Sequence, residues 1–243
     1  MLLVGLDAAT KFEKFGFACG YVRNDIVQID RAGLLKGPEC SDALAEIIIP
    51  ALKTATDALI AIDAPLGWPG GMATALGPHM AGELIRTDPG MLFLRETDRD
   101  IKKRVGKTPL EVGADRIART AHAALCVLHL LRQGVGKPIP LAWSRKFEGV
   151  VAVEVYPAAT LIGWGCDSTG YKKPTDVAAR EGIADKLSGA IAGLSAAVGG
   201  PADVFDACLC LVAAKDFLDG RAMRPRDHDL AIKEGWIWAR RPQ

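Results

Sequence analysis

Three short apolar runs, each with a carboxylate near its carboxyl end, stand out in the hydrophobic pattern of the chain. They are residues 2–7 (LLVGLD), 58–63 (ALIAID) and 150–155 (VVAVEV). Runs that stay apolar without alternation are typical of strands buried on both faces of a sheet. Because ligands of open α/β sheets bind beyond the carboxyl ends of the strands, we expect Asp7, Asp63 and Glu154 to approach one another there.

The hydrophobic pattern of the first third of the chain predicts a strand, a hairpin, a helix and a further strand. Residues 15–22 and 26–35 predict two antiparallel strands joined by a tight turn at Asn24-Asp25. A helix is expected over residues 41–54, with Ser41 as its N-cap. This helix would connect the first strand to the fourth, so those two strands are expected to be parallel neighbours.

The pattern of the rest of the chain predicts a helical insertion and then another strand of the sheet. Residues 66–149 show no alternation of strands and helices, and one long helix is expected over residues 114–133. The later elements are expected to be a strand at 150–156, helices at 175–198 and 201–220, and a short helix and strand within 229–238. We therefore expect an α/β fold in one domain, residues 1–243, with the helical insertion after the fourth strand.

Composition restricts the classes of protein to consider. The net charge is only +1, although residues 66–149 carry 13 Lys and Arg against 8 Asp and Glu, a net of +5. A basic segment beside an acidic remainder suits a phosphate-bearing substrate, and it equally suits an ordinary charged surface. The six cysteines show no metal-binding spacing, and neither a signal segment nor a membrane-spanning run is visible. We expect a soluble protein of the reducing cytoplasm with no membrane partner.

Four aspartates are the main candidates for chemistry. Asp7 and Asp63 end buried strands, where a carboxylate is costly unless it is paired or coordinated. Asp203 and Asp206 are three residues apart and share one face of the 201–220 helix. Asp203 has a simpler explanation in the helix dipole, whereas Asp206 lies in an almost wholly apolar window and needs a partner. A divalent cation with oxygen ligands would satisfy the group.

Two further sets of charges leave alternatives open. Glu154 is equally consistent with a metal ligand, a general base or an ion-pair partner for the insertion. Arg95, Asp98 and Arg99 belong to a dense charged run that is usually an exposed helix face. The functional alternative is a clamp for substrate phosphate, to which arginine geometry is well suited.

The order and spacing of these motifs resemble the domain-of-unknown-function family 429 over nearly the full chain. The segments that carry the resemblance are 5–8 (GLDA), 62–67 (IDAPLG), 95–99 (RETDR), 154–157 (EVYP), 203–207 (DVFDA) and 234–237 (EGWI). The resemblance implies a ribonuclease H-like fold and a nuclease activity. The wider ribonuclease H-like group carries acidic ligands on the first strand, the fourth strand and a late helix, and Asp7, Asp63 and Asp206 match those places.

The activity that the resemblance implies is hydrolysis of a phosphodiester with two metal ions. Asp7 would bridge the ions, Asp63 and Asp206 would each hold one of them, and Asp203 or Glu154 would complete the ligands. All-oxygen ligation favours Mg²⁺ or Mn²⁺ over zinc. Arg95 and Arg99 would neutralise the phosphate of a nucleic acid or another phosphodiester.

Two other functions stay open at this point. One is ATP-dependent phosphotransfer, as in sugar kinases and ATPases of related topology, although no second glycine-rich phosphate loop is found. The other is a nucleic-acid-binding module without turnover, against which the lack of interleaved basic and aromatic residues argues mildly. The sequence leaves the substrate and the oligomeric state open.

Overall fold

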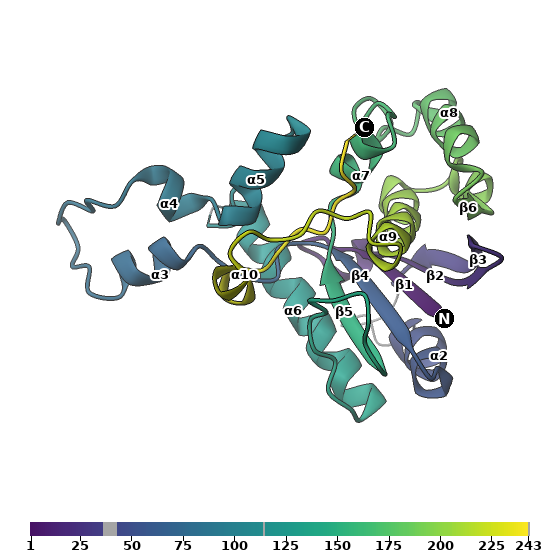
Figure 1. Ribbon diagram of the computed structural model, residues 1–243, viewed down its shortest axis with the longest axis horizontal. Helices are drawn as coiled ribbons and strands as arrows, with labels where there is room; N and C mark the ends of the chain where they lie inside the picture. Colours follow the sequence, from purple (N-terminus) through teal and green to yellow (C-terminus); the bar gives the residue numbers. More distant parts are fainter. Residues whose placement is uncertain (36–42, 114, 243) are drawn as a thin grey trace.

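The computed structural model describes residues 1–35, 43–113 and 115–242, which form a mixed sheet in the order β5-β4-β1-β2-β3-β6 (Figure 1). The strands are β1 (Leu2–Asp7), β2 (Gly16–Arg23), β3 (Ile26–Leu34), β4 (Ala58–Asp63), β5 (Val150–Glu154) and β6 (Ile191–Ala192). β1, β4 and β5 are parallel, and β2 is antiparallel to both of its neighbours. The predicted α/β fold, with a mixed sheet flanked by helices, is confirmed.

Helices lie on both faces of this sheet and beyond its edge. Their bounds are η1 (Phe12–Lys14), η3 (Leu44–Ile48), α2 (Ile49–Thr54), α3 (Gly70–Leu76), α4 (Pro89–Phe93), α5 (Glu96–Val105), α6 (Asp115–Val135), α7 (Pro157–Gly163), α8 (Val177–Leu187), η4 (Leu194–Ala197), α9 (Ala202–Leu218) and α10 (His228–Glu234). Among the described residues, no helix is both long and apolar enough to cross a membrane.

The alternation of side chains along the strands divides the core into two layers. Leu3 and Leu59 pack against α9 on one face of the sheet. Leu2, Val4 and Ile60 point to the other face, where they meet α2 and α6. Successive strand residues face opposite ways, so Asp7 and Asp63 follow Leu3 and Leu59 and face the α9 layer.

Two glycines allow α9 to lie directly on the strands. A Cβ at Gly5 of β1 would overlap the carbonyl oxygen of Ala207, and one at Gly16 of β2 would overlap that of Asp203. Only glycine permits so close an approach of two backbones. The contact fixes the first turns of α9 over the carboxyl end of β1, which brings Asp203 and Asp206 close to Asp7.

Several predicted boundaries are wrong, each for a local reason. The helix expected over 175–198 ends at Leu187, because Ile191 then pairs with Val27 at the sheet edge. The strand expected over 150–156 ends at Glu154, and Pro157 begins the unpredicted helix α7. The N-cap assigned to Ser41 lies outside the described residues.

The stretch from α3 to α4 projects from the body as an arm (Figure 1). Both ends of the arm are held by one buried side chain, that of Glu234 at the end of α10. Its Oε1 accepts a hydrogen bond from the backbone N–H of Gly70 at 2.7 Å, and its Oε2 accepts one from the N–H of Glu96 at 2.7 Å. The arm therefore begins and ends at a single carboxylate.

Candidate metal centre

Asp7 and Asp63 lie directly opposite each other at the carboxyl ends of the adjacent parallel strands β1 and β4. Their side chains leave the sheet on the same face. Burial and the charge of Asp63 hold the pKa of Asp7 well above its usual range. Burial and the charge of Asp206 raise the pKa of Asp63 to about 7. Such a pair is poorly tolerated as two anions, so it favours a shared proton or a bound cation.

Asp206 approaches this pair from α9 and is 1% exposed. Its Oδ1 accepts a hydrogen bond from the hydroxyl of Tyr171 at 2.8 Å. Its Oδ2 lies 2.6 Å from the Nζ of Lys172. Burial raises the pKa of Asp206, and the nearby Lys172 acts in the opposite direction. The third aspartate is thus held by a lysine and a tyrosine from the loop before α8.

The carboxylates open into a cavity of about 520 Å³. Its wall includes Asp7, Asp63, Asp203, Lys172, Tyr156 and Thr120. Asp203 is partly exposed there. A cavity of this size, with converging charged groups, has room for a segment of a substrate as well as for ions.

Glu154 takes part in a different contact, although its backbone lies beside β4. It pairs with Ile62 rather than with Asp63, so its side chain leaves the sheet on the opposite face from the aspartates, although it borders the same cavity. There it forms a two-pronged ion pair with Arg95, with Nη2–Oε1 at 2.8 Å and Nη1–Oε2 at 2.9 Å. Its Oε2 also accepts a hydrogen bond from the N–H of Leu66. Among the roles left open, the geometry matches the ion-pair partner.

The expected phosphate clamp is occupied by internal contacts. Arg95 is 1% exposed and also pairs with Asp98, which is 0% exposed. Arg99 donates from Nη1 to the carbonyl oxygens of Gly90 and Leu94. The guanidinium of Arg95 is consumed by two carboxylates, so Arg95, Asp98 and Arg99 hold the fold of the insertion in this structure. A sequence pattern cannot separate a buried network of this kind from an exposed charged helix.

The donor set fits a hard cation in its chemistry, and only partly in its arrangement. Within the described residues, no group of three or more His, Cys, Asp or Glu side chains is arranged to hold an ion. Asp7 and Asp63 supply two adjacent carboxylates, and Asp206 is turned to Lys172. All-oxygen donors of this type suit Mg²⁺ or Mn²⁺. Release of Asp206 from Lys172 would supply the third carboxylate.

Sequence reasoning missed Tyr171 and Lys172. They lie in an irregular loop, 164–176, where no periodic pattern shows which side chains turn inward. The one available signal was the presence of adjacent lysines, Lys172 and Lys173, and it does not tell which of them reaches a carboxylate.

Comparisons with known proteins bear on the family and the fold. Comparison with curated protein sequences found no match. Among solved structures, the chain is similar to T. thermophilus RuvC in complex with a Holliday junction substrate, at 10% identity and a TM-score of 0.35, covering 90% of this chain and 97% of that one. A family described as protein of unknown function (DUF429) matches over residues 14–230, and this chain belongs to that family.

Proposed function

We propose that the protein is a nuclease that hydrolyses phosphodiester bonds with Mg²⁺ or Mn²⁺ held at the aspartate cluster. The observation that carries the proposal is the pair Asp7–Asp63, placed side by side at the ends of two parallel strands, lining an open cavity and close enough to Asp206 to feel its charge. Burial and the charges of neighbouring carboxylates raise the pKa values of Asp7 and Asp63, and Lys172 offsets this only in part. A divalent cation would balance the negative charge of these carboxylates.

The position of each residue determines the role that we propose for it. Asp7 and Asp63 would hold the ion, Asp206 would join them when free of Lys172, and Asp203 stands at the cavity wall. The bound ion supplies Lewis-acid activation of water and stabilisation of the leaving oxygen. The Lys172 side chain is 60% exposed and lies at the same wall, where its ammonium group can pair with a phosphate oxygen of the substrate.

A pair of variants tests the proposal. Asp7→Asn keeps the size of the side chain and removes its charge, so cleavage of labelled DNA or RNA in Mn²⁺ should be lost while the fold is kept. Asp185→Asn, which removes an exposed carboxylate on α8 outside the cavity, reports what the loss of a remote charge alone does to activity. Cleavage by Asp7→Asn at the wild-type rate would remove the proposal.

The same preparation separates the two other functions. Nucleic-acid binding in Mn²⁺ without any cleavage would favour a binding module. Thermal stabilisation by ATP, together with phosphate transfer to an acceptor, would favour a phosphotransferase.

A further inference from the structure

Two adjoining hollows in the surface are both lined by arginines. The first measures about 160 Å³ and the second about 350 Å³, and they share Gly220 and Ala222. The arginines that line them are Arg145 and Arg224 in the first, and Arg221, Arg240 and Arg241 in the second. We call the two hollows together the arginine groove.

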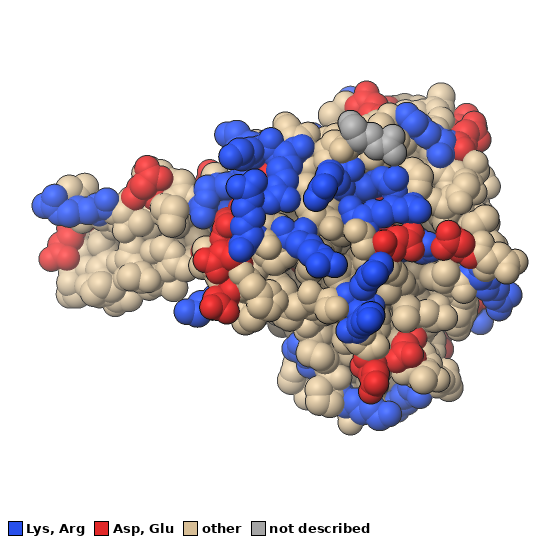
Figure 2. Space-filling view, viewed as in Figure 1, with Lys and Arg blue, Asp and Glu red and all other residues tan. Residues whose placement is uncertain are grey.

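Most of the positive charge in the arginine groove is not balanced within the protein. In the described part of the chain, Arg145, Arg224 and Arg241 form no ion pair. Arg240 is paired with Asp216 at 2.7 Å, and Arg221 lies 3.6 Å from Asp219. On the face shown in Figure 2, Lys and Arg side chains gather over the upper and central part, with Asp and Glu side chains beside and below them. Like charges gathered without partners repel one another, so the groove favours an anionic ligand.

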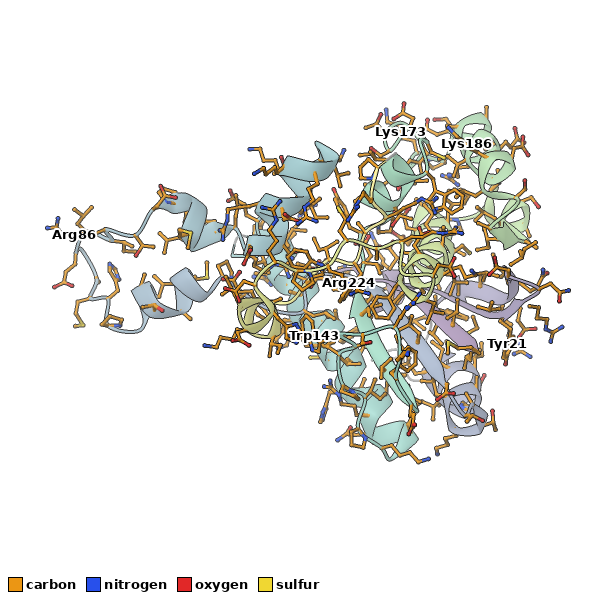
Figure 3. All side chains as sticks on the ribbon, viewed as in Figure 1. Tyr21, Arg86, Trp143, Lys173, Lys186 and Arg224 are labelled. Atoms are coloured by element: carbon orange, nitrogen blue, oxygen red, sulfur yellow. The ribbon has the colours of Figure 1, made fainter. Side chains whose placement is uncertain are left out.

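An aromatic ring lines the same groove. Trp143 borders the first hollow together with Arg145 and Arg224, and it meets the ring of His228 edge to face, with centroids 5.4 Å apart. Trp143 and Arg224 are both near the middle of the face in Figure 3. Cationic side chains for phosphates beside an aromatic ring for a base are the usual composition of a surface that binds a single nucleic-acid strand.

The arginine groove lies back to back with the aspartate cavity. Two consecutive residues separate them: Ile237 lines the aspartate cavity, and Trp238 lines the arginine groove. Trp238 also donates from its backbone N–H to the carbonyl oxygen of Glu154 at 2.9 Å, so this segment is fastened to the end of β5. A strand held in the groove would therefore lie on the other side of the segment that forms this part of the wall of the aspartate cavity.

We propose that the arginine groove binds the phosphodiester backbone of a single-stranded nucleic acid, with Arg145, Arg224 and Arg241 as the phosphate contacts. The use of that strand as a substrate rests on the proposed nuclease function. The binding itself does not, because the groove shares no side chain with the aspartate cluster.

The test measures binding without cleavage. The full chain carries Asp7→Asn and is kept in a chelator, and the fluorescence anisotropy of a labelled oligothymidylate is followed over a series of KCl concentrations. Each phosphate contact adds about 0.7 to the slope of log affinity against log salt for single strands, so Arg145→Gln with Arg224→Gln should lower the slope by about 1.4. Arg145→Lys with Arg224→Lys, which keeps the charge, should leave the slope near that of the parent.

The matched control is Lys53→Gln with Lys137→Gln, which removes the same charge from two exposed lysines elsewhere on the surface. An equal loss of slope in this control would show that the strand binds by general charge attraction, and it would overturn the proposed binding site in the groove. Tight binding of thymidine monophosphate, with no gain for a longer strand, would overturn it in favour of a small-ligand site. Groove-dependent binding without cleavage in the unsubstituted protein would instead count against the nuclease function alone.

Discussion

Lys172 reaches Asp206 at 2.6 Å from a side chain that is 60% exposed, while Asp206 is 1% exposed. A largely exposed ammonium group thus holds a buried carboxylate that lies close to Asp7 and Asp63. Because the lysine and a metal ion attract the same oxygen, each must weaken the binding of the other. The ion pair is therefore a barrier to metal binding as well as a local stabilising contact.

Removal of this competitor should strengthen metal binding. Lys172→Met is expected to raise the affinity for Mn²⁺ by roughly threefold to tenfold, equivalent to ~1 kcal/mol for a half-exposed ion pair. Calorimetric titration measures the affinity directly. Lys173→Met is the matched control, because it removes the neighbouring exposed lysine. Cleavage by Lys172→Met should nevertheless fall if the ammonium group contacts substrate phosphate, and weaker Mn²⁺ binding by this variant would contradict the competition.

The stability of the metal-free protein should depend on the charge of Asp63. Its pKa is raised from 3.8 to about 7, chiefly by burial, so the folded chain holds a proton that the unfolded chain has lost. The folded state binds more protons between these two values, and its stability should fall as pH rises from about 4 to about 7 and then level off. Thermal melting in a chelator measures this trend.

Metal should reverse that dependence, because Mn²⁺ binds the deprotonated carboxylates. The melting temperature in Mn²⁺ is expected to rise over the same pH interval. Asp63→Asn provides the control, since it should reduce both trends to the part that comes from Asp7 and Asp206, whose pKa values are also raised by burial. A wild-type melting curve in chelator that does not change between these pH values would show that the Asp7–Asp63 pair is not strained.

The buried network around Arg95 should govern folding rather than catalysis. Arg95→Met leaves Glu154 and Asp98 buried without their partner, and it should reduce the free energy of unfolding by about 3–5 kcal/mol. Adding Glu154→Gln to Arg95→Met should restore part of the loss, because one uncompensated charge is then removed. Urea denaturation gives these values. A fully stable Arg95→Met with weakened substrate binding would return Arg95 to the phosphate clamp.

The contact at Gly5 should link the fold to the metal site. Gly5→Ala forces the backbone of α9 away from β1, which is expected to cost about 2 kcal/mol or more of stability and to weaken Mn²⁺ binding, since Asp206 moves with α9. Gly182→Ala in α8 is the control, because no atom lies within 4 Å of its added Cβ and helix propensity favours alanine there. Both effects are read by melting and calorimetry on the same samples.

Much of the aspartate cluster could be predicted from the sequence, because strand order and apolar runs determine where β1, β4 and α9 meet. The same alternation that places Asp63 toward α9 also turns Glu154, opposite Ile62, to the other face. That distinction needed the register between β4 and β5, which a single sequence does not supply. Arg95 shows the complementary difficulty, since its burial depends on Glu154, 59 positions further along the chain.

Glu234 gives the arm between α3 and α4 a mechanical property. Its carboxylate fastens both ends of the arm, and its own carbonyl oxygen accepts a hydrogen bond from Arg95 at 3.3 Å. A force applied at the tip of the arm would consequently act on Glu234, because both ends of the arm are bound to this one side chain. Glu234 is three residues from Ile237 in the wall of the aspartate cavity, so a force on the arm would reach a segment of the chain that borders this cavity.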